Sequence, residues 1–67
     1  MMEFEVVREN RNYEFIFDIA FEEYQNHINV IYDIIWERLK IDYGQMIQYE
    51  MSCESFGNKT KFYVIVK

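Results

Sequence analysis

Few side chains in this sequence could act as nucleophiles, metal ligands or proton carriers, and they lie far apart. His27 is the only histidine and Cys53 the only cysteine among 67 residues. A lone cysteine cannot form an internal disulfide, and one histidine with one cysteine cannot supply the four ligands of a structural zinc site. His27 lies between Asn26 and Ile28, beside an apolar stripe. A histidine there is far more often a structural residue than a catalyst.

The short motifs that carry catalysis are also missing. The chain has no glycine-rich phosphate loop, no serine-centred elbow and no cluster with metal-ligand spacing. Its 12 Asp and Glu residues are plentiful, but none has the apolar neighbours that a general acid needs. Cys53 is expected on the inward face of a strand, where a buried lone cysteine behaves as a small apolar residue. We therefore expect a protein that is not an enzyme and that uses no cofactor and no metal ion.

Two hydrophobic periods organise the chain, which we interpret as a single domain over residues 1–67. Apolar and polar residues alternate, as in strands, within residues 2–9, 13–19, 46–54 and 60–66. Asparagine and glycine residues mark a turn inside each pair of strands. A helical period fills the space between the two hairpins. The sequence predicts an α+β fold of order ββαββ, with a four-stranded, mainly antiparallel sheet and one long helix packed on one face.

The helix is expected over residues 20–43. Its apolar stripe is Tyr24, Ile28, Ile31, Ile35 and Leu39, and its polar stripe is Glu22, Asn26, Asn29, Asp33, Glu37 and Lys40. Asp18 is the expected N-cap, because aspartate accepts hydrogen bonds from the free N–H groups of a helix start. Gly44 is expected to end the helix, since glycine takes the left-handed conformation of a C-terminal cap.

The apolar arc of this helix is wider than a sheet needs. At about 100° per residue the arc spans roughly 240°, whereas a helix on a sheet needs about 100° or somewhat more. Either the strand side chains and loops wrap further round the helix, or part of the arc is a contact surface for a partner. The candidate contact residues are Val30, Ile34 and Ile41 on one flank, or Tyr32 and Trp36 on the other.

Charge is the second feature that points to a partner. The formal net charge is −5, so direct binding to nucleic acid, which needs a basic surface, is not expected. The carboxylates expected on the face away from the helix are Glu3, Glu5, Glu14 and Asp18. Alternate residues of a strand stand about 6.6 Å apart. Rows of carboxylates at that spacing resemble phosphates along a nucleic-acid backbone, although ordinary solvated polar residues would give the same pattern.

The site of action is expected to be the cytoplasm, or the host cytoplasm if the protein is viral. No segment approaches the roughly 18 apolar residues that span a membrane. The first residues carry acids where a secretory signal carries bases. No membrane partner is therefore expected.

In size, acidity and aromatic content the chain is similar in general character to small phage and mobile-element proteins that block a host enzyme. The similarity is in composition and covers no motif. Our leading hypothesis is a small acidic inhibitor that occupies the basic, nucleic-acid-binding surface of a host protein. The alternative is a homo-oligomeric structural or regulatory module, similar to an antitoxin, whose excess apolar helix face is its own dimer interface.

Overall fold

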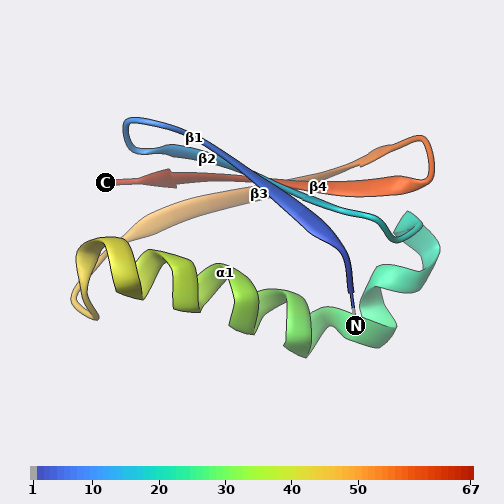
Figure 1. The fold of residues 1–67 in the computed structure, drawn as a ribbon, viewed down its shortest axis with the longest axis horizontal. Helices are drawn as coiled ribbons and strands as arrows, with labels where there is room; N and C mark the ends of the chain where they lie inside the picture. Colours follow the sequence, from blue (N-terminus) through green and yellow to red (C-terminus); the bar gives the residue numbers. More distant parts are fainter. Residues whose placement is uncertain (1) are drawn as a thin grey trace.

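The computed structural model describes residues 2–67, apart from the side chain of Phe56 (Figure 1). Its strands are β1 (Phe4–Glu9), β2 (Asn12–Phe17), β3 (Tyr49–Phe56) and β4 (Lys59–Val66). A 3₁₀ helix, η1 (Phe21–His27), leads into the α-helix α1 (Ile28–Tyr43). The structure confirms the predicted ββαββ order and the α+β class.

The four strands form one antiparallel sheet in the order β1-β2-β4-β3. Strands β2 and β3, which the helical segment joins, run parallel with β4 inserted between them. Helix α1 lies across one face of this sheet (Figure 1). Strands β1 and β3 are therefore the two edges, at opposite sides of the molecule.

Residues with positive φ make the turns that the sequence predicts. Asn10, with φ 58°, turns the chain between β1 and β2, and Gly57, with φ 62°, does so between β3 and β4. Gly44 has φ 84°, and its N–H donates to the carbonyl of Lys40 at 2.8 Å at the end of α1. Glycine is suited to position 44 because an L side chain is strained at that φ.

The core lies between α1 and the two central strands. Helix α1 contributes three buried aliphatic residues, which pack against buried residues of β2 and β4. The set is Ile31, Ile35 and Leu39 from α1, Tyr13, Phe15 and Phe17 from β2, and Phe62, Val64 and Val66 from β4. Thr60 is also buried, and its hydroxyl donates to the carbonyl of Ile19 at 2.9 Å. The buried face of the helix is the one that the periodicity predicts.

The predicted start of the helix is wrong. The α-helix begins at Ile28, and the preceding turns are 3₁₀ over Phe21–His27. Asp18 does not cap either helix, because the residues in the cap positions are Ala20 and His27, with no side-chain cap hydrogen bond. Asp18 instead extends the hairpin ladder, since its N–H donates to the carbonyl of Glu3 at 3.0 Å.

The expected burial of Cys53 is also wrong. Cys53 lies opposite Phe62 of β4, which is buried under the helix, yet Cys53 is exposed. The reason is the strand order, because β3 is an edge strand and α1 buries side chains of the central strands β2 and β4.

The core predicts a sharp difference between two faces of α1. Ile31→Ala or Ile35→Ala should each lower the free energy of unfolding by about 2–5 kcal/mol, because a buried side chain is lost and a cavity remains. Asp33→Ala, on the exposed face, should change it by less than about 0.5 kcal/mol. Urea unfolding followed by circular dichroism measures both, and equal losses at buried and exposed positions would show that the buried face is misassigned.

Candidate protein-binding surface

The acidic residues expected to form a binding face lie on the side of the sheet away from α1. Phe15 and Phe17 are buried against the helix, so the alternate residues Glu14 and Ile16 point to the other face. Glu5 lies opposite Ile16 in β1 and shares that face. The sheet therefore holds the carboxylates of its first hairpin on an uncovered surface.

Three of the four predicted acids gather round one hollow. Glu3, Glu5 and Asp18 line a depression of about 420 Å³ at the end of the β1–β2 hairpin, together with Met2, Phe4, Ile16 and Lys59. The backbone hydrogen bond between Asp18 and Glu3 puts these two acids directly across from each other. Like charges in that position destabilise a strand pair. Among the described residues, none of the three forms an ion pair.

Glu14, the fourth predicted acid, lies on the same face but forms an ion pair, which the other three do not within the described part of the chain. Its Oε1 is 3.5 Å from the ammonium of Lys61 in β4, and its side chain is half-buried. Two lysines that follow Phe56 in the sequence thus pair with acids elsewhere on the sheet, Lys61 with Glu14 and Lys67 with Glu50 at 2.5 Å. The carboxylates that remain outside such pairs in the first hairpin include Glu3, Glu5 and Asp18.

The first apolar flank of α1 lines a groove beside β1. The groove has a volume of about 440 Å³ and is walled by apolar residues, with Asp33, Glu37 and Arg38 among its other lining residues. Its apolar residues are Val30, Ile34 and Ile41 from α1 and Phe4 and Val6 from β1. Val30 is 50% exposed and Ile41 is 76% exposed. The strand side chains therefore do not wrap round this flank.

The second apolar flank faces the other edge of the sheet. Tyr32 and Trp36 line a groove of about 270 Å³ with Tyr49 and Met51 of β3. The ring centroid of Trp36 is 6.5 Å from that of Tyr49, and Tyr32 makes an edge contact with the buried Phe62 at 6.4 Å. The two sets of flank residues thus lie in different grooves, on opposite sides of α1, and do not form one patch.

Strand β1 is where the acidic face and the first groove meet. Because strand side chains alternate between faces, Phe4 and Val6 line the groove on the helix side, while Glu3 and Glu5 line the hollow on the other side. A partner that binds at the β1 edge can therefore contact carboxylates and aliphatic side chains at the same time. The sequence predicted both features but not their common border, because the border depends on β1 being an edge strand.

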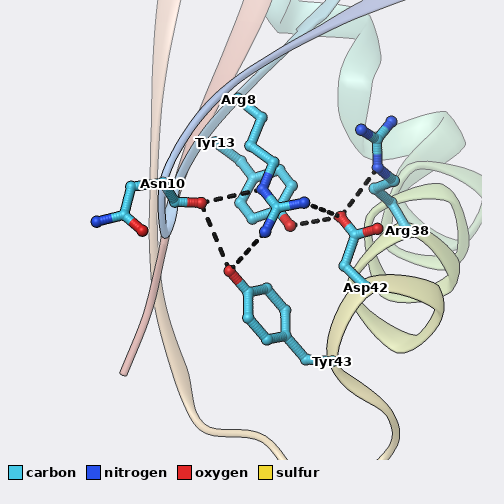
Figure 2. Close-up of polar contacts among 6 residues, drawn as sticks. All are labelled: Arg8, Asn10, Tyr13, Arg38, Asp42 and Tyr43. Atoms are coloured by element: carbon cyan, nitrogen blue, oxygen red, sulfur yellow. Dashed lines mark hydrogen bonds and ion pairs between the residues drawn. The ribbon is translucent and has the colours of Figure 1, made fainter.

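A polar network that the sequence analysis missed fastens the end of α1 to the first hairpin (Figure 2). The Asp42 carboxylate accepts hydrogen bonds from the Tyr13 hydroxyl at 2.5 Å, from Arg38 at 3.2 Å and from Arg8 at 3.3 Å. Arg8 also donates to the Tyr43 hydroxyl at 2.9 Å and to the Asn10 carbonyl at 3.0 Å. One signal was available, because Arg8 follows Phe4 and Val6 on the helix-facing side of β1, where an apolar residue is expected.

The network shifts the titration of its members. Burial, reinforced by the hydrogen bond to Asp42, raises the pKa of Tyr13 well above its ordinary value near 10. The hydrogen bond from Tyr13, with Arg38 and Arg8 nearby, lowers the pKa of Asp42. Both shifts favour neutral Tyr13 bonded to ionised Asp42, which is the pair that holds the helix end in place.

Neither a metal site within the described residues nor a relative of known function is found for this protein. Within residues 2–67, no group of three or more His, Cys, Asp or Glu side chains could hold a metal ion. In the same part of the chain, no helix has the length and apolar character needed to cross a membrane. Comparisons with protein-family models, with curated proteins and with solved structures found no match.

The network predicts opposite effects of pH at the two ends of the scale. The stabilisation from Tyr13 is complete below its usual pKa of about 10 and is lost as pH rises through the raised pKa, because the unfolded chain gives up the proton first. The stabilisation from Asp42 is present above about pH 4 and is lost as pH falls through the lowered pKa. Urea unfolding at a series of pH values should therefore show an alkaline loss that Tyr13→Phe reduces.

Tyr32→Phe is the matched control for that experiment, because Tyr32 is a partly exposed tyrosine outside the network. It should keep the alkaline loss of the wild type, whereas Asp42→Asn should remove part of the acid loss. Indistinguishable pH profiles for wild type and Tyr13→Phe would contradict the assigned role of the network.

Proposed function

We propose that this protein acts by binding another protein at the β1 edge, where it occupies a basic surface that otherwise binds nucleic acid. The observation that carries the proposal is the gathering of Glu3, Glu5 and Asp18 round one hollow beside an apolar groove. Such a protein is an inhibitor of the phage or mobile-element type, and it works by occupation without catalysis. The proposed site of action is the cytoplasm, or the host cytoplasm if the chain is viral.

The carboxylates supply the charge complementarity in this proposal. Glu5 lies in β1 and Glu3 directly before it, at the spacing of about 6.6 Å that alternate residues of an extended chain have, and Asp18 faces Glu3 across the hairpin. Lysine and arginine side chains that accept phosphates can accept carboxylates in the same positions. The repulsion between Glu3 and Asp18 is relieved when a basic partner binds. Binding would therefore explain why two like charges face each other, which ordinary solvation of the surface does not.

The groove on the other side of β1 supplies apolar contact. Exposed aliphatic side chains such as Val30 and Ile41 exclude water from an interface when they are covered, and they add area that charges alone do not provide. The carboxylates then set the rate of encounter and the choice of partner, while the groove slows dissociation.

A second candidate function uses the same groove differently. Ile41 is 76% exposed, and a second copy of this chain that covered it would make a homo-oligomeric regulatory module similar to an antitoxin. In that case assembly would be insensitive to the charges of Glu3 and Glu5.

Charge reversal on β1 tests the proposal. The double variant Glu3→Lys/Glu5→Lys should bind the captured basic protein with an affinity lower by about tenfold or more, which is about 1.4 kcal/mol. The matched control is Glu22→Lys/Glu23→Lys, which makes the same change of charge at two exposed acids that do not line the hollow. Each immobilised variant is incubated with a nuclease-treated extract of the cells that encode the protein, and bound proteins are quantified by mass spectrometry.

Two further readouts make the outcome specific. Adding double-stranded DNA should release the protein captured by wild type, and raising the salt concentration should weaken capture, since exposed charges are screened over about 8 Å at physiological ionic strength. Capture that ignores DNA and salt and survives the reversal on β1 would contradict the proposal.

A further inference from the structure

The hydrogen-bond ladder leaves alternate residues of β3 facing outward at the edge of the sheet. Strand β3 pairs with β4 in unbroken register from Tyr49 to Phe56, and the N–H of Lys67 donates to the carbonyl of Gln48 at 2.9 Å. Bonded and non-bonded positions alternate in an antiparallel pair, so the even-numbered residues of β3 bond to β4. The backbone N–H and C=O groups of Tyr49, Met51, Cys53 and Ser55 therefore point to the free edge.

This edge carries few of the features that block pairing with another strand. Natural edge strands are protected by proline, by lysine, by bulges or by being short. Strand β3 has eight residues, contains no proline and no lysine, and pairs with β4 without a bulge. Its two charges are engaged within the protein, Glu50 with Lys67 and Glu54 with the Tyr63 hydroxyl.

We propose that β3 pairs antiparallel with β3 of a second copy of this chain, centred on Cys53, so that two sheets join into one of eight strands. The two copies are related by a two-fold axis perpendicular to the sheet, which keeps both helices on the same face. The inference is independent of the proposed function, because the acidic hollow and its neighbouring groove lie at the β1 edge.

The charges of β3 select the register. With Cys53 at the centre, Glu54 lies opposite Ser52 of the second copy, and Glu50 lies opposite the Phe56 position. With Ser52 at the centre, Glu50 and Glu54 oppose each other twice, and like charges directly opposite destabilise a pair. With Met51 at the centre, fewer residues of β3 overlap. The Cys53-centred register is therefore the longest one that avoids facing carboxylates.

The distribution of charge over the sheet also favours a second copy at β3. The β3–β4 hairpin, over residues 49–67, carries two acids and three lysines, whereas the β1–β2 hairpin, over residues 3–18, carries five acids and two arginines. Because β3 and β1 are opposite edges, joining two β3 strands keeps the acidic hairpins far apart. The second copy would also lie beside the side chains of Met51 and Tyr49, which are 36% and 37% exposed in the single chain.

Sedimentation equilibrium on the full chain tests this inference. Two short strands should give a dimer with a dissociation constant between about 1 µM and about 1 mM, the range of weak interfaces. Cys53→Pro should raise that constant about tenfold or more, because the lost N–H points to the free edge and not to β4. Cys53→Lys, which sets two ammonium groups together at the axis, should do the same if the proline variant fails to fold by circular dichroism.

Ile41→Asp is the control, because Ile41 lies in the groove beside β1 and the dimer should survive this change. A short bismaleimide should also join Cys53 of two copies, and urea should abolish that cross-link. A protein that stays monomeric at about 1 mM, or a dimer that survives both Cys53 variants, would overturn the inference. A dimer lost with Ile41→Asp alone would overturn it in favour of the groove. Neither result bears on partner binding at Glu3 and Glu5.

Discussion

The structure depends on the width of one helix relative to the sheet that it covers. An α-helix with its side chains is about 10–12 Å across. Four strands about 4.8 Å apart make a sheet about 19 Å wide. A single helix can therefore bury the helix-facing side of two strands. It does so for β2 and β4, whose inward residues join the buried residues of α1 in one core.

Because the helix is narrower than the sheet, the two edge strands β1 and β3 are only partly covered. On the β1 side, Phe4 and Val6 share a groove with Val30 and Ile41, and the carboxylates of Glu3 and Glu5 line the hollow on the other face of the sheet. On the β3 side, Tyr49 and Met51 are partly exposed beside Trp36. The network round Asp42 holds α1 over the centre by tying its last turn to Tyr13 of β2 and Arg8 of β1. Both edges are thus left open by a helix whose position is fixed.

The sequence predicted what local periodicity controls. The alternation of Tyr13, Phe15 and Phe17 and the spacing of Ile31, Ile35 and Leu39 gave the elements and their buried faces, because both depend on near neighbours in the chain. The position of Gly44 gave the helix end. The excess width of the apolar arc left two alternatives open, and the exposure of Val30 and Ile41 shows that the strands do not wrap round that flank of α1.

The predictions that were wrong, and the contacts that were not predicted, depend on segments distant in the sequence. The burial of Cys53 was wrong because strand order, which places β3 at an edge, leaves no local signal. Asp18 looked like a cap, but a hydrogen bond to the distant Glu3 keeps it in the hairpin. The pairing of Glu14 with Lys61 and the bond from Tyr13 to Asp42 join residues more than 25 positions apart. No pattern within a window of residues specifies such pairs.

Amide hydrogen exchange, followed residue by residue by NMR in dilute solution, tests most directly whether β1 and β3 are the unpaired edges of the sheet. We expect alternation along the edge strands: Val6 and Met51 exchange fast, while their neighbours Val7 and Ser52 are protected by β2 and β4. Along the central strands, Phe15 and Phe62 should be protected together with their neighbours. Uniform protection along β1 or β3 at low concentration, or alternation of the opposite parity, would contradict the account.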